Sequence, residues 1–178
     1  KDTLVFQASS PLLSRDWVFH IGSPLQTQIH NAPLSSIIRL RTANLPKLAK
    51  YLTYRDHLLF QRIHTEELVG LAWMKDDGGH SAPNVKELIS RFNQTALWVS
   101  SSIVTEMKIK KRVHALTCAL DLIEELMLLR NWHGVQMVIA GLSHAAVSRL
   151  RKTWGSIDKQ KYDLYLKMEE VFSPLHNW

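Results

Sequence analysis

The chain has 178 residues and a mass of 20.5 kDa, and its 46% apolar and 21% charged residues fit one globular domain rather than a collagen-like, low-complexity or fully disordered protein. The most apolar stretch, residues 116–129, contains three acidic residues and is too short for a membrane-spanning helix, which needs roughly 20 apolar residues. Lys and Arg give a net charge of +6, so the chain is mildly basic.

Residues 1–35 differ in composition from the remainder of the chain. They hold three of the six prolines and show no sustained apolar period, which indicates an N-terminal extension or linker. The first residue is Lys1, and no basic-then-apolar signal pattern follows it. We therefore expect a piece of a longer protein, with a helical domain over residues 36–178.

Helical spacing begins in this second part. Thr53 and Asp56 have the spacing of a capping box, which predicts a short helix beginning at Thr53. After a turn at residues 76–79, Pro83 occupies a position that the first turn of a helix tolerates. Apolar residues then recur at steps of three and four, which predicts a long helix. They are Val85, Leu88, Ile89, Phe92, Ala96, Val99, Ile103 and Met107.

Two further helices are predicted downstream. One covers residues 109–130, where a wide apolar stripe indicates a central position, and the other covers residues 158–172. Strand-like character occurs only around residues 135–142. We expect an all-α protein with the architecture of a multi-helix orthogonal bundle.

Neither metal nor disulfide chemistry is predicted. Cys118 is the only cysteine, so no internal disulfide can form, and the histidines lack the spacing of a zinc site. No metal ligand or cofactor is expected.

A basic cluster follows the first long helix. This cluster fits either an acidic partner or a solvated helix end. It consists of Lys108, Lys110, Lys111 and Arg112, together with Arg149, Arg151 and Lys152. Aromatic residues do not alternate with these cations as they do in single-strand binders, so we expect no nucleic-acid partner.

Ser143 raises one enzymatic alternative. Residues 137–145 resemble a degenerate nucleophile elbow, and Asp158 or Asp163 and then His176 follow in the order of a hydrolase triad. A helix ending at Gly141, with Ser143 capping the next helix, is the simpler interpretation.

Several ordered motifs point to a family. They are residues 63–73, 82–85, 91–93, 98–99, 111–113, 129–132, 141–143, 146–150, 153–154, 173–174 and 177–178. Together they resemble the catalytic domain of the Ras-family guanine-nucleotide exchange factors over about residues 36–178. The resemblance implies an all-helical regulatory protein without covalent chemistry, which binds the nucleotide-free GTPase and so promotes GDP release.

The resemblance also implies site residues. Ile89 and Trp178 match the walls of a pocket for an aromatic residue of the GTPase's switch 2, while Gln136 and Ser143 match further GTPase contacts. Gln136 stands where the family usually has Leu or Met, and Ser143 where many members have Asn. Asn93 and Arg149 match as supporting residues, for which helix packing or loop fixing is expected.

Two functional interpretations remain besides the hydrolase. One is an exchange factor, or a fragment of one, for a Ras, Rap or Ral type GTPase; the other is an exchange-inactive scaffold that binds signalling partners. The family continues past the motif at residues 177–178 with a helical hairpin, so we expect the chain to lack that segment. The resemblance implies a cytoplasmic protein that meets membranes only through the lipidated GTPase.

Overall fold

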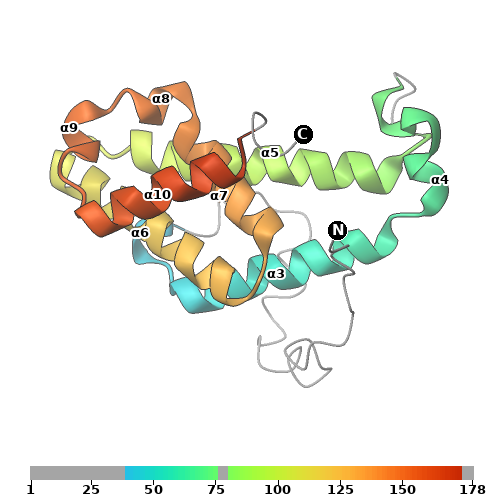
Figure 1. Cartoon of the computed structure of the whole chain (residues 1–178), viewed down its shortest axis with the longest axis horizontal. Coiled ribbons are helices and arrows are strands. Elements are labelled where there is room, and N and C mark those ends of the chain that lie inside the picture. Colours follow the sequence, from blue (N-terminus) through green and yellow to red (C-terminus); the bar gives the residue numbers. More distant parts are fainter. Residues whose placement is uncertain (1–38, 76–79, 174–178) are drawn as a thin grey trace.

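The computed structural model describes residues 39–75 and 80–173, which form helices and no strand (Figure 1). This confirms the predicted all-α class. In chain order the helices are η3 (Leu40–Thr42), α3 (Leu45–Arg62), α4 (Thr65–Leu68), η4 (Val69–Met74), α5 (Pro83–Val104), α6 (Ile109–Leu128), α7 (Trp132–Ser143), α8 (Ala145–Ser148), α9 (Arg151–Trp154) and α10 (Lys159–Val171).

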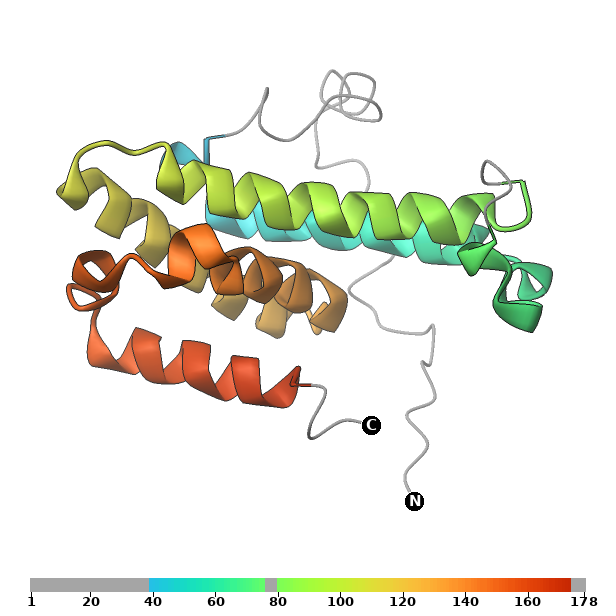
Figure 2. The same ribbon diagram turned by 90° about the horizontal axis from the view of Figure 1, so that it is seen from above.

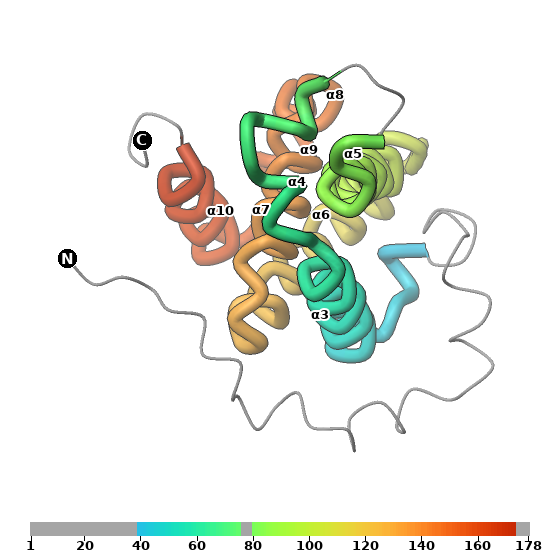
Figure 3. The backbone as a smooth tube through the Cα atoms, turned by 90° about the vertical axis from the view of Figure 1, so that its right-hand side faces the viewer, coloured from blue at the N-terminus to red at the C-terminus, as the bar shows by residue number. Residues whose placement is uncertain are grey.

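The core is built around α6 and α7. These helices lie between α10 on one side and α3 and α5 on the other (Figure 3). Eight residues of α6 and seven of α7 are buried, as the wide apolar stripe of residues 109–130 predicts. Helices α3 and α5, of 18 and 22 residues, run side by side and extend beyond this core to α4 and η4 (Figures 1 and 2).

A glycine sets the contact between α5 and α7. A Cβ atom on Gly141 would lie 2.6 Å from the carbonyl oxygen of Ala96 and 2.8 Å from Cβ of Val99. No larger residue fits at that distance, so Gly141 is what allows the two helices to pack so closely.

One predicted helix boundary is wrong. The helix that contains Thr53 begins eight residues earlier, at Leu45, where Asn44 accepts a hydrogen bond from the amide of Lys47 and Pro46 occupies the first turn. Thr53 lies inside α3 and donates its hydroxyl to the carbonyl oxygen of Ala49. Its spacing to Asp56 is therefore not a capping box.

Two other local expectations are corrected. Residues 135–142, which carried strand-like character, are helical because α7 is apolar on nearly every face and so lacks a clear period. The first long helix ends at Val104, so Met107 does not belong to its apolar face. Met107 lies in the α5–α6 turn, where 90% of it is exposed.

Three predicted segments lie in parts of the chain that the structure does not describe. The predicted extension, the turn at residues 76–79 and the C-terminal residues 174–178 lie outside the described residues. Within the described ranges, no helix combines the length and apolarity that crossing a bilayer requires. The same ranges contain no group of three His, Cys, Asp or Glu residues placed to hold a metal ion.

Candidate functional site

The outer side of α5 carries Ile89 and Asn93. Ile89 is 44% exposed although it belongs to the apolar period that predicted the helix. Asn93 follows one turn later and is exposed, and Leu97 follows a turn after that with 63% exposure. The side chain of Asn93 therefore projects from the helix surface rather than into the helix packing that was expected for it.

The outer side of α7 lies on the neighbouring helix. Gln136 is exposed, so its amide is hydrated in the free chain, and Trp132 one turn earlier is 47% exposed. Helices α5 and α7 pack against each other at Gly141, and we call the surface carried by Ile89, Asn93 and Leu97 of α5 and by Trp132 and Gln136 of α7 the α5–α7 face. The structure thus places Ile89, Asn93 and Gln136 on two packed helices.

The start of α5 is fixed by a carboxylate from another helix. Ala82, at the N-cap, supplies no capping side chain. Instead Glu67 of α4 accepts hydrogen bonds from the amides of Asn84 (2.8 Å) and Val85 (3.0 Å), from the Asn84 side chain (2.7 Å) and from the amide of His64 (3.3 Å). A negative charge at a helix N-terminus is also favourable to the helix dipole.

These bonds control the ionisation of Glu67. Its burial disfavours the charged form, but the four donors outweigh burial and lower its pKa to about 2. Residues 63–73 and 82–85, which carried part of the family resemblance, therefore include a structural clamp that orients α5.

The start of α7 is fixed by Asn131. Its side-chain oxygen accepts a hydrogen bond from the amide of Gly134 at 2.7 Å, and its side-chain amide donates to Asp56 at 2.8 Å and to Thr53 at 3.1 Å. A Cβ atom on Gly134 would lie 2.7 Å from the Asn131 amide nitrogen, so glycine is needed there. Burial raises the pKa of Asp56 to about 6, against the opposing effects of Asn131 and of Arg91 and Arg55.

His133, the second residue of α7, packs between two phenylalanines. Its ring contacts Phe60 of α3 edge-on at a centroid distance of 5.3 Å and Phe92 of α5 at 5.6 Å. Burial lowers the pKa of His133, which favours the neutral ring between the two phenylalanines. The sequence did not indicate this contact, because the three residues lie on three separate helices.

Ser143 is turned toward α10. It is the last residue of α7, and its hydroxyl lies 3.1 Å from Oε1 of Glu169 and 3.2 Å from the hydroxyl of Tyr165. Tyr165 also donates to Glu169, at 2.7 Å. Burial, together with the bond to Glu169, raises the pKa of Tyr165 to about 12, so the phenol stays protonated and can donate.

The arrangement does not support a hydrolase. Ser143 is not the cap of α8 that was expected, because His144 accepts the hydrogen bond from the amide of Ala146 through Nδ1. Asp158 caps α10 by accepting from the amide of Gln160. The preceding segment is a helix rather than the strand of a nucleophile elbow, and His176 lies outside the described residues.

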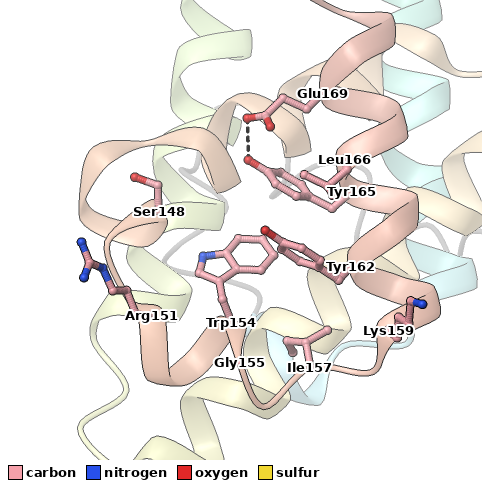
Figure 4. Close-up of a pocket in the computed structure, with 10 residues that line it drawn as sticks. All are labelled: Ser148, Arg151, Trp154, Gly155, Ile157, Lys159, Tyr162, Tyr165, Leu166 and Glu169. Atoms are coloured by element: carbon pink, nitrogen blue, oxygen red, sulfur yellow. Dashed lines mark hydrogen bonds between the residues drawn. The ribbon is translucent and has the colours of Figure 1, made fainter.

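A groove beside Ser143 was not anticipated from the sequence. It lies between α9 and α10 (Figure 4), and its floor holds Trp154, whose ring lies 4.7 Å from Tyr165 and 5.7 Å from Tyr162. Trp154 is fixed because its indole nitrogen donates to the carbonyl oxygen of Val147 at 3.1 Å. Tyr162 occupies an apolar position of α10, yet it is 39% exposed at this groove.

The remaining predicted residues lie elsewhere. Arg149 is exposed between α8 and α9, and no hydrogen bond or ion pair joins its side chain to residues 39–75 or 80–173. The loop is held instead by Trp154 and by a bond from Arg112 to Thr153. Trp178 lies outside the described residues, so its place in a pocket stays a prediction.

Comparison with known proteins identifies relatives. The RasGEF domain family is matched over residues 47–178. The chain is 34% identical over 165 residues to Ras guanine nucleotide exchange factor P of Dictyostelium discoideum, an alignment covering 92% of this chain and 11% of that protein. It is 34% identical over 125 residues to factor E of the same organism, which covers 70% of this chain and 12% of the relative.

A mammalian relative is also similar to this chain over only part of its own length. The Ras-specific guanine nucleotide-releasing factor RalGPS1 of Mus musculus is 30% identical over 132 residues, which is 74% of this chain and 23% of that protein. The chain therefore spans a quarter or less of the length of each of these curated relatives.

Proposed function

This chain belongs to the RasGEF domain family, and we propose that its α5–α7 face binds a Ras-family small GTPase and that the chain contributes in this way to guanine-nucleotide exchange. The face presents Ile89 and Asn93 of α5 and Gln136 of α7 on two helices whose contact and starting points are fixed. A rigid surface binds with a smaller entropy cost than a mobile one.

The exposed apolar surface of these helices carries the proposal. Ile89 and Leu97 on α5 and Trp132 on α7 are between 44% and 63% exposed, although both helices also fill the core. Large apolar side chains presented by rigid elements are the usual anchors of protein interfaces. These exposed side chains suit contact with the aromatic switch 2 residue that the family resemblance implies for the partner.

The finer geometry follows from the family. Ile89 and Trp178 would form two walls around an aromatic residue of switch 2, with Gln136 at the pocket's edge. Gln136 is hydrated in the free chain, and burying its amide without a partner would cost about 1–3 kcal/mol. A partner that offers Gln136 a hydrogen bond is therefore favoured.

Exchange requires no covalent chemistry. A surface that binds the nucleotide-free GTPase more tightly than the loaded one lowers the affinity for GDP by the same factor. A surface that binds both states equally leaves the nucleotide equilibrium unchanged.

An exchange-inactive scaffold is the second candidate. Two observations favour it: Gln136 is a polar residue where the family usually has an apolar one, and the hydroxyl of Ser143 is directed to Tyr165 and Glu169 of α10. Such a surface would bind a GTPase, or another signalling partner, without distinguishing its nucleotide states.

Binding and nucleotide release are measured together to test both candidates. The chain is titrated against Ras, Rap and Ral type GTPases in nucleotide-free and GDP-loaded forms, and release of a fluorescent GDP analogue is followed in parallel. Ile89→Asp and, separately, Trp178→Ala should each weaken binding to the nucleotide-free form by at least about 2 kcal/mol.

Val104→Asp is the matched control, because Val104 is a branched, 40% exposed residue of the same helix, about 22 Å away along its axis. Loss of binding in Ile89→Asp alone, with GDP release by the unchanged chain, supports the exchange factor. Binding without release supports the scaffold. Absence of binding to every GTPase in both states overturns the proposal.

A further inference from the structure

One end of the molecule combines an exposed apolar residue with a dense group of cations. Met107, in the turn between α5 and α6, is 90% exposed, and Ile109 at the start of α6 is 41% exposed. Lys108, Lys110 and Lys111 alternate with them and are all exposed. This turn lies at the same end as α8 and α9 (Figures 1 and 2).

A partly buried hydrogen bond joins the start of α6 to α9. Arg112 donates through Nε to the hydroxyl of Thr153 at 3.0 Å and through a second nitrogen to the carbonyl oxygen of Glu106 at 3.3 Å. Thr153 is 1% exposed, so this connection is part of the packed structure. Helix α9 thus packs against α6, and its Arg151 and Lys152 are exposed.

These cations are not used by the fold. Among residues 39–75 and 80–173, no carboxylate lies within ion-pair distance of Lys108, Lys110 or Lys111. Glu106, which precedes Met107 in the same turn, pairs instead with Arg41 at 3.0 Å.

The first turn of α6 is also unfavourable for lysine. It contains no acidic residue, and cations there face the positive end of the helix dipole. Lys108 at the N-cap makes no capping hydrogen bond with its side chain. The three lysines therefore cost the fold some stability and become favourable only beside a dense negative charge.

We propose that this end, formed by residues 107–111 and by Arg151 and Lys152, binds directly to the surface of an anionic lipid bilayer. Met107 and Ile109 would enter the boundary between headgroups and acyl chains, while the five cations would contact anionic headgroups. The expectation from the sequence was membrane contact only through a lipidated partner, so this inference adds a contact made by the chain itself.

A bilayer fits the combination better than a nucleic acid. Phosphates alone would account for the cations but not for Met107, an apolar side chain that is 90% exposed in the same turn. A single-strand binder would also place aromatic rings among the cations. Trp154, which follows Arg151 and Lys152 in α9, is instead packed against Tyr165 and donates a hydrogen bond to the carbonyl oxygen of Val147.

The test uses the full chain and flotation with vesicles. Vesicles of phosphatidylcholine alone are compared with vesicles of phosphatidylcholine mixed with phosphatidylserine. We expect binding to the mixed vesicles only, and weaker binding as salt is raised, because salt screens exposed charges. Lys110→Glu combined with Lys111→Glu should weaken binding at least about tenfold.

Two matched controls separate the site from general charge and apolarity. Lys75→Glu combined with Lys167→Glu changes two exposed lysines elsewhere, and since each change removes two charges, both double variants fall from +6 to +2. Met107→Ser should weaken vesicle binding, whereas Met74→Ser, at a 70% exposed methionine in η4, should not. All four variants alter exposed side chains, and thermal unfolding verifies that each is folded.

Three outcomes overturn the inference. They are equal binding to both kinds of vesicle, equal losses in the two double variants, and tight binding of duplex or single-stranded nucleic acid at a salt concentration at which the mixed vesicles are not bound. GTPase binding by Lys110→Glu combined with Lys111→Glu should be unchanged, so failure of this proposal is distinguishable from failure of the exchange-factor proposal.

Discussion

The two junctions that hold the α5–α7 face each contain a buried carboxylate, and the two carboxylates ionise in opposite ways. At the α4–α5 junction, Glu67 is 4% exposed and has a pKa of about 2. At the α3–α7 junction, Asp56 is 6% exposed and has a pKa of about 6. Both side chains are therefore shielded from solvent, but desolvation outweighs the opposing interactions only at Asp56.

Hydrogen-bond donors contribute to this difference. Glu67 accepts four hydrogen bonds, three of them from backbone amides, so its charged form is stabilised more than burial destabilises it. Asp56 accepts a hydrogen bond from the side-chain amide of Asn131, which also donates to Thr53. The charges of Arg55 and Arg91 do not offset the desolvation of Asp56. One junction is thus strengthened by its charge, and the other carries its charge at a cost.

The largest expected effect is at the α3–α7 junction. Asn131→Ala removes the cap of α7 and takes a donor from the buried Asp56 carboxylate. Losing a cap costs about 1 kcal/mol, and a buried group that loses its partner costs about 1–3 kcal/mol more. We expect urea unfolding at neutral pH to show a loss of about 2–4 kcal/mol.

Asn44→Ala is the matched control for that prediction. Asn44 caps α3 through the amide of Lys47, but it is exposed and serves no buried carboxylate. Its loss should be about 1 kcal/mol. Equal losses in the two variants would show that the Asp56 network adds nothing beyond the cap.

Asp56→Asn should change how stability depends on pH. Because the folded pKa is raised from 3.8 to about 6, the folded state holds the proton more strongly, and wild-type stability falls as pH rises through this interval. The Asn variant lacks this loss. Relative to wild type, its unfolding free energy should rise by about 2 kcal/mol between pH 4 and pH 7. A difference that is constant over this range would contradict the raised pKa.

Glu67→Gln should show the opposite pH dependence. The folded pKa lies below the usual value of 4.5, so the carboxylate stabilises the fold above that pH, and this contribution is lost as pH falls toward about 2. Since the substituted amide side chain keeps one acceptor oxygen, we expect a smaller loss than in Asn131→Ala. Acid unfolding of the variant should lack this component, whereas Glu66→Gln, at an exposed neighbour, should retain it.

Long periodic helices were the part of the fold that the sequence predicted well. The predicted helices at residues 109–130 and 158–172 agree with α6 and α10 because apolar residues recur at helical spacing in both segments. The start of α3 was missed because Thr53 and Asp56 imitate a capping box. Asp56 in fact faces Asn131, 75 residues away, and local spacing contains no information on such a contact.

The site could be predicted only in part for the same reason. Family motifs indicated Ile89 and Gln136, and both are exposed on packed helices. The groove at Trp154 depends on which way α9 and α10 face each other, and the exposure of Met107 depends on where α5 ends. Both are properties of tertiary packing, which overrides the local period.

Ser143→Ala should have the smallest effect, although Ser143 also bonds to a carboxylate. Its partner Glu169 is exposed, and so is Ser143 itself, so water can take the place of the lost hydroxyl. We expect a stability change below about 1 kcal/mol, unchanged GTPase binding, and no labelling of Ser143 by an organophosphonate probe. Tyr165→Phe removes the other hydroxyl on the same Glu169 oxygen, but Tyr165 is 7% exposed, so its loss should be larger. If Ser143→Ala proved as costly as Asn131→Ala, the number of hydrogen bonds rather than their burial would decide the energies of all three networks; labelling of Ser143 would instead revive the hydrolase.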